Sequence, residues 1–150
     1  MLVFNFLLAF FFLLSFGPRA KACTCTDSPR YTALQLADFV TKCRVVGSKM
    51  SPGGTALVYN VRHLRVFKPN DTQLAEEMFT SPWPSSCGVT QLEKDHEYLL
   101  VGYESSGKLR LNTCLSVPAS ASDTSSPPGA LDWKSVDAEL AAQLEAGVFT

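Results

Sequence analysis

The stretch whose residue types and spacing could do unusual chemistry is Ala20-Lys21-Ala22-Cys23-Thr24-Cys25. Ala20 and Ala22 fit an A-x-A signal-peptidase site, so cleavage after Ala22 makes Cys23 the first residue of the mature chain. A free α-amine has a pKa of about 7.7 to 8.0, which leaves part of it neutral at physiological pH. That nitrogen and the carbonyl oxygen of Cys23 can form a five-membered chelate ring on a metal ion.

Residues 1–22 predict a secretory signal peptide. Residues 1–16 are apolar except for Asn5 and Ser15, which is typical of a signal h-region and shorter than the ~20 residues of a transmembrane helix. No Lys or Arg precedes this run, which is atypical of a signal peptide. We expect a secreted, extracellular protein without membrane insertion.

The mature chain of 128 residues has the length of one domain with its own core. It carries 11 basic and 14 acidic side chains and no basic cluster interleaved with aromatic residues, so nucleic-acid binding is not expected. His63 and His96 are isolated and read as ordinary histidines. Because no nucleophile-base-acid set or complete metal site can be assembled from this sequence, we do not expect an enzyme. We also expect a monomer.

The cysteines of the mature chain are Cys23, Cys25, Cys43, Cys87 and Cys114. In an oxidising compartment, this number supports two disulfides and one remaining thiol. Spacing leaves every pairing open, because any cysteine can be left over and the other four can pair in three ways. Zinc-finger spacing is absent, and no βαβ pattern supports a redox C-x-C motif.

Runs of β-branched and aromatic residues predict a small β-barrel. Strands are expected at residues 34–47, 55–68, 77–80, 97–104 and 108–114. A change in the apolar pattern near Arg62 and His63 predicts a β-bulge. These signals favour a mainly β fold, a closed Greek-key barrel of the oligonucleotide/oligosaccharide-binding (OB) type with a terminal helix, over residues 23–117.

Two loops carry specific expectations. Ser81–Gly88 is too proline-rich for a central strand and is expected to be exposed and stiff. Trp83, between two prolines, is either a contact residue or a lid packed on the barrel, and we favour packing. Asn70 begins an N-x-T sequon, so it is either an N-glycosylation site or part of an unmodified loop.

The C-terminal part is expected to be a linker followed by a helix packed on the barrel. Residues 118–130 are rich in Ser, Ala and Pro, as a linker is. Residues 131–147 predict the helix, with Asp132 as its N-cap, Gly147 as its C-cap and an apolar face formed by Val136, Leu140 and Leu144.

One set of residues resembles the N-terminal, netrin-like inhibitory domain of the tissue inhibitors of metalloproteinases. The set comprises Cys23-Thr24-Cys25, Asp38-Phe39-Val40, Val46-Gly47, Cys87-Gly88, Thr113-Cys114 and Trp133. The most specific part is the leader cleavage that exposes C-T-C. The resemblance implies a secreted, single-domain inhibitor of zinc metalloproteinases of the matrix metalloproteinase kind.

The resemblance also implies the site. Cys23 would pair with Cys87, and Cys25 with Cys114. The amine and carbonyl oxygen of Cys23 would bind the zinc of the partner proteinase, so the chain needs no cofactor of its own. Thr24 would enter the primary specificity pocket of the proteinase, and the substrate cleft would also contact Thr26, Pro84, Ser85 and Ser86.

Two departures from the family pattern stand beside the resemblance. A third disulfide of the family begins near the position of Gln35, where this chain has no thiol, and the cysteine-rich C-terminal subdomain is replaced by the linker and helix. Cys43 is expected to be a buried, inert thiol, with an intermolecular bridge as the alternative. The alternative function is a non-inhibitory netrin-like module that engages a receptor or matrix component.

Overall fold

The structure, a computed structural model, describes residues 23–25, 30–70, 72–118, 120, 123 and 125–149. The expected signal peptide and Thr26 therefore lie outside the described residues. The regular elements are α2 (Arg30–Leu36), β1 (Phe39–Met50), η1 (Pro52–Gly54), β2 (Leu57–Lys68), β3 (Glu77–Thr80), η2 (Pro84–Ser86), β4 (Glu97–Ser105), β5 (Lys108–Arg110), β6 (Leu131–Asp132), η3 (Trp133–Ser135) and α3 (Ala138–Ala146). None of the helices in these ranges has the length and apolar character required to cross a bilayer.

Five strands close into a barrel in the order β1-β2-β3-β5-β4, and β4 pairs again with β1. β3 and β5 are parallel, whereas the other pairs are antiparallel, and β6 adds a short strand beside β4. In the β1–β2 pair, Cys43 faces His63 and Lys42 faces Arg65, so Leu64 forms a bulge next to the predicted position. The predicted closed OB-like barrel with a C-terminal helix is confirmed.

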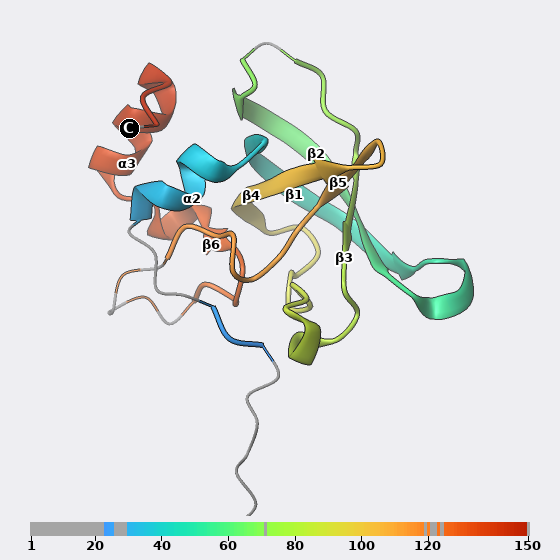
Figure 1. Ribbon diagram of the computed structural model, residues 1–150. Helices are drawn as coiled ribbons and strands as arrows, with labels where there is room; N and C mark the ends of the chain where they lie inside the picture. The colour runs from blue at the N-terminus through green and yellow to red at the C-terminus, as the bar shows by residue number, and fades with distance from the viewer. Residues whose placement is uncertain are drawn as a thin grey trace, which may run out of the picture.

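The barrel has an apolar cluster on each side of its wall. Along β4, Tyr98 and Leu100 contribute to the interior cluster, while Leu99 and Val101 belong to a second cluster beneath the helices. Successive residues of a strand point to opposite faces, so a strand covered on both sides is apolar throughout. Figure 1 shows the covered side, where α2 and α3 lie on one flank of the barrel, and the β1–β2 hairpin projects from the other.

The first predicted strand was wrong in its N-terminal part, because Arg30–Leu36 form helix α2 and β1 begins at Phe39. Ala33, Leu34 and Ala37 are buried in the outer cluster, one helical face against the barrel. Lys68 Nζ donates hydrogen bonds to the carbonyl oxygens of Leu34 (3.3 Å) and Gln35 (3.0 Å), near the C-terminus of the helix. A basic group there satisfies carbonyls that lack partners within the helix.

The C-terminal helix is shorter than predicted. Leu131 pairs with Leu99 and Asp132 with Tyr98, so this segment extends the sheet. Asp132 caps η3 by accepting a hydrogen bond from Lys134 N at 2.9 Å, and it does not cap α3.

Asp137 is the N-cap of α3, where its carboxylate accepts from Leu140 N at 2.8 Å. Leu140 and Leu144 are buried in the outer cluster, whereas Val136 lies before the helix. Gly147 has φ 66° and ends the helix as predicted. The start of the helix was predicted too early because Asp132 and Asp137 both precede the apolar residues Leu140 and Leu144, and the sequence alone does not show which of the two is the N-cap.

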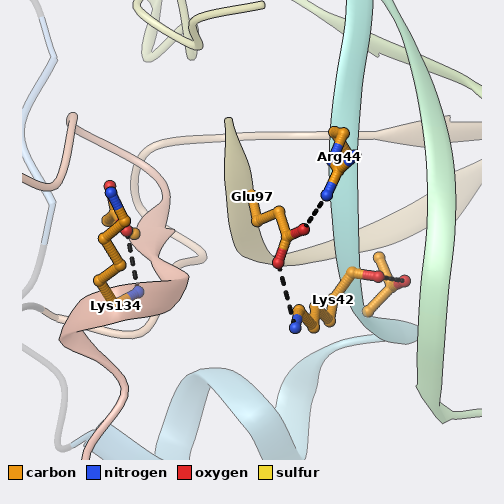
Figure 2. A network of polar contacts seen from close by, with 6 residues as sticks. Lys42, Arg44, Glu97 and Lys134 are labelled. Atoms are coloured by element: carbon orange, nitrogen blue, oxygen red, sulfur yellow. Dashed lines mark hydrogen bonds and ion pairs between the residues drawn. The ribbon is translucent and has the colours of Figure 1, made fainter. Parts of the chain in front are cut away.

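A polar network fastens η3 to the barrel. Glu97 on β4 accepts from Arg44 and lies 3.1 Å from Lys42 Nζ, both of them on β1 (Figure 2). The Lys42 ammonium also lies 4.4 Å from the ring centroid of Trp133, which stacks on Phe67. The hydrogen bonds from Arg44 and Lys42 lower the pKa of Glu97. The Glu97 carboxylate thus joins β4 to β1, and the Trp133 indole joins the C-terminal segment to the barrel.

Cys43 lies inside the barrel with no exposed surface and forms no disulfide. Burial, with the nearby charge of Glu97, raises the pKa of its thiol to about 12. A thiolate is the reactive form of cysteine. The side chain is therefore placed as a core residue, without access to a second chain.

Candidate functional site

Two disulfides hold the N-terminal segment at both of its cysteines. Cys23 is bonded to Cys87 and Cys25 to Cys114, with Cα–Cα distances of 5.2 and 5.1 Å. This is the pairing that the family resemblance implied. The bridges also touch each other, because Cys114 Sγ lies 3.6 Å from Cys87 Sγ and 4.0 Å from Cys23 Sγ. We call the surface formed by residues 23–25, 83–88 and 112–114 the ridge.

The four sulfur atoms of the ridge lie within 4.8 Å of one another, a spacing that a metal site could also have. All four are in disulfides, so none is a thiolate, the form of cysteine that binds metals. The cluster is therefore a covalent cross-link and supplies no metal ligand by its side chains.

The second segment of the ridge, residues 83–88, is a short turn whose backbone is fixed by hydrogen bonds. Trp83 has φ −117° and ψ 124°, the extended conformation that a following proline favours. Its carbonyl oxygen accepts from Ser86 N at 3.0 Å and from Gly88 N at 3.1 Å. Pro84, Ser85 and Ser86 form η2 and are exposed, as expected for contact residues.

Trp83 corrects the sequence-based expectation. Its side chain is 64% exposed, so it does not pack on the barrel as a lid. Trp83 belongs to neither of the two apolar clusters.

Gly88 is required by the geometry of this turn. A Cβ at Gly88 would lie 2.1 Å from the carbonyl oxygen of Ser81 and 2.9 Å from that of Trp83. Both contacts are with backbone atoms, which cannot move aside without opening the turn. In the Cys87-Gly88 pair, the first residue thus forms a disulfide and the second must lack a side chain.

Thr80 joins the two barrel segments that carry the ridge. Its hydroxyl donates to the Leu111 carbonyl oxygen at 3.0 Å and accepts from Val89 N at 2.9 Å, and the side chain is buried. Thr113 N also donates to the Cys87 carbonyl oxygen at 3.0 Å. Sequence reasoning missed Thr80, because a threonine at the end of a strand gives no signal of its own.

The N-terminal segment is fixed yet accessible. Thr24 and Cys25 are exposed, and Cys23 is partly buried, with its Sγ 3.5 Å from Thr113 Oγ1. The segment around Thr24 is therefore presented to solvent between two covalently held neighbours. Figure 1 shows this segment in blue, beside the turn of η2 and below the barrel.

The expected linker is partly packed against the ridge. A pocket of about 540 Å³ is lined by Cys23 and Cys25 of the ridge and by Pro127 and Gly129 of this segment. Gly129 and Ala130 are buried, and a Cβ at Gly129 would lie 2.5 Å from Val89 Cγ2. The described part of this segment is thus built into the domain near the ridge.

Asn70, the candidate glycosylation site, is exposed. Its Nδ2 lies 3.7 Å from the position that a Cβ on Gly147 would take, so it is next to the end of α3. The loop that follows β2 lies at the opposite end of the molecule from the ridge (Figure 1). A glycan on Asn70 would therefore leave the ridge uncovered.

Comparisons with known proteins place this chain in a family. The model of the UNC-6/NTR/C345C module matches residues 31–121. Metalloproteinase inhibitor 3 of Xenopus laevis is 29% identical over 107 residues, which cover 69% of this chain and 50% of the relative. Metalloproteinase inhibitor 2 of Bos taurus is 29% identical over 107 residues, covering 65% and 48%.

The chain spans about half the length of these curated relatives. The family match begins at residue 31, after the Cys23-Thr24-Cys25 segment, so it rests on the barrel and its strands. It extends over more than half of the chain. The chain therefore belongs to the UNC-6/NTR/C345C module family, as a netrin-like domain of the kind found in metalloproteinase inhibitors.

Proposed function

We propose that the chain is a secreted inhibitor of zinc metalloproteinases, and that mature Cys23 binds the partner's catalytic zinc through its α-amine nitrogen and carbonyl oxygen. The observation that carries the proposal is the cross-linking of Cys23 and Cys25 on either side of an exposed Thr24. A chain terminus is normally mobile. Here the disulfides fix it before binding, so little conformational entropy is lost on docking.

The chemistry follows from the way catalytic zinc is held. Such a zinc has three protein ligands and keeps an open position for the water that it activates. An amine and a carbonyl oxygen from the same residue can occupy that position and displace the water. The inhibitor then acts stoichiometrically, with the zinc and its ligands supplied by the partner proteinase.

The rest of the ridge supports the same role. The Thr24 side chain would enter the primary specificity pocket, with Thr26 and the exposed Pro84-Ser85-Ser86 turn on either side of it in the substrate cleft. The curated relatives are named as metalloproteinase inhibitors. The family's third disulfide is missing, but Lys68 holds the end of α2 by two hydrogen bonds, and the ridge has its own two bridges.

Titration of a panel of secreted zinc metalloproteinases tests the proposal. One form of the protein begins at Cys23, and a matched form begins at Ala22. Acylation removes the lone pair of the Cys23 nitrogen, so the longer form should inhibit at least about 100-fold more weakly, a loss of about 2.8 kcal/mol. Both forms should unfold at the same temperature.

The rival function gives a different result. A netrin-like module that engages a receptor or matrix component would inhibit none of the proteinases, and the extra residue would not change its binding. Failure of the Cys23 form to inhibit any member of the panel would contradict the proposal.

A further inference from the structure

Trp83 is a large apolar side chain that folding leaves in solvent. The exposed large hydrophobic residues among those that the structure describes are Leu36, Val46, Met50, Leu64, Trp83 and Val148, and Trp83 is the only aromatic one. The other tryptophan of the chain, Trp133, stacks on Phe67 with 6.2 Å between ring centroids. Trp83, in contrast, is 64% exposed and belongs to neither apolar cluster.

The backbone beneath this side chain is held firmly. Ser81 Oγ accepts from Trp83 N at 3.2 Å, and the Trp83 carbonyl oxygen accepts from Ser86 N and Gly88 N. Prolines precede and follow Trp83, which restricts the backbone further. A fixed backbone carrying an exposed indole is pre-organised, because few degrees of freedom remain to be lost on binding.

Trp83 also lies in the ridge itself. The turn that it begins ends at Cys87, which is bonded to Cys23, the residue that carries the proposed chelate. Along the chain, only the exposed residues of η2, Pro84 to Ser86, separate Trp83 from Cys87. The turn that carries Trp83 is therefore cross-linked to the N-terminal segment.

We propose that Trp83 is a main anchor of the inhibitory surface, and that its indole docks in an apolar subsite of the same metalloproteinase beside the zinc cleft. This inference rests on the proposed function. Tryptophan is enriched among the few interface residues that carry most of the binding energy. Because the side chain is free of the barrel core, its removal changes binding without changing folding.

The inhibition constant of Trp83→Ala tests the proposal, measured with the member of the panel that the Cys23 form inhibits most strongly. We expect inhibition about 30-fold weaker, the effect of losing a strong anchor. Leu36→Ala is the matched control, because Leu36 is 69% exposed and lies on α2 outside the ridge. The control should inhibit like the wild type, and all three proteins should have the same unfolding temperature.

A second readout follows Trp83 directly in the complex. Protein labelled with 5-fluorotryptophan has two ¹⁹F signals, which Trp83→Phe assigns to Trp83 and Trp133. Adding the unlabelled catalytic domain of the proteinase should shift the Trp83 signal and leave the Trp133 signal unchanged. Signals that shift with the inhibitor's own concentration, without proteinase, would identify a second copy as the occupant and overturn the proposal.

The outcomes separate this inference from the proposed function. Inhibition by the wild type, together with an unchanged inhibition constant for Trp83→Ala, overturns the role of Trp83 alone. Absence of inhibition by the wild type across the panel overturns both. Inhibition that is about 30-fold weaker for Trp83→Ala and unchanged for Leu36→Ala, with a shifted Trp83 signal, supports both.

Discussion

Individual residues of the ridge divide into those that the sequence could reveal and those that it could not. The C-T-C segment after an A-x-A site was visible, because cleavage chemistry depends on local sequence. Thr80 and the outward position of Trp83 were not, because both depend on where distant backbone segments lie. A hydroxyl that bridges Val89 and Leu111 can be recognised only when those residues are brought together.

Thr24 offers a test of the specificity pocket. Thr24→Gly removes an exposed side chain between two disulfide-bonded cysteines, so the fold should keep its unfolding temperature. Loss of the side chain from a specificity pocket should weaken inhibition by about 10- to 100-fold. Thr24→Ser, which retains Oγ, should lose less. Equal inhibition of every tested proteinase by Thr24→Gly and the wild type would contradict this role.

Thr80 offers a test of how the ridge is held. Thr80→Val keeps the shape of the side chain but leaves the Val89 N–H and the Leu111 carbonyl without their partner. The free energy of unfolding should fall by about 1 to 3 kcal/mol in denaturant titrations. Thr55→Val is the control, because it removes only an exposed hydrogen bond between Thr55 Oγ1 and Ser51 Oγ at 3.3 Å, and it should change the free energy of unfolding by less than about 0.5 kcal/mol. Equal stabilities of the two variants would rule out the bridging role.

Strands and helices were predictable where one pattern dominated. The strand at Glu77–Thr80 agrees with the prediction. The β4–β5 hairpin also forms where it was predicted, but β5 ends at Arg110, whereas the predicted strand ran to Cys114. The prediction failed at α2, because a short helix has too few residues to show a period, and its apolar residues resemble those of a strand end. It also failed at residues 131–137, where pairing with β4 extends the sheet. Tertiary contacts decided both cases.

The network at Glu97 gives a prediction for the pH dependence of stability. Hydrogen bonds from Arg44 and Lys42 lower the pKa of Glu97 from its ordinary value of 4.5. A lowered folded-state pKa stabilises the fold above the ordinary value, and this contribution is lost as the pH falls through the folded-state pKa.

Glu97→Gln should therefore be less stable than the wild type at pH 7, and the difference should shrink below about pH 4. Denaturant unfolding at several pH values measures it. Glu104→Gln, in the same strand without a described ion pair to Lys or Arg, should show a smaller pH-dependent difference. A Glu97→Gln difference that does not change with pH would contradict the assignment.

At the scale of the whole domain, the number of strands and the turn signals predicted the closed barrel. They did not predict which segments pack against the outside of the barrel. The expected linker gave no apolar pattern, yet Gly129 and Ala130 are buried beside the ridge. Low-complexity composition indicates little about packing when a glycine is needed for close contact, as at Gly129.

The two disulfides join regions 64 and 89 residues apart, so they link the N-terminus to the rest of the fold. The double variant Cys25→Ser/Cys114→Ser should lower the free energy of unfolding by about 2 to 5 kcal/mol. Inhibition should also weaken well below the unfolding temperature, because Thr24 would then be held at one side alone. Full inhibition by a folded double variant would contradict the role of the second bridge.

The most direct measurement is a crystal structure of the form that begins at Cys23, bound to the catalytic domain of a zinc metalloproteinase that it inhibits. The α-amine nitrogen and the carbonyl oxygen of Cys23 should both coordinate the zinc at about 2.0 to 2.2 Å, with no water left on the ion. A complex in which that nitrogen points into solvent, far from the zinc, would contradict the proposed mechanism.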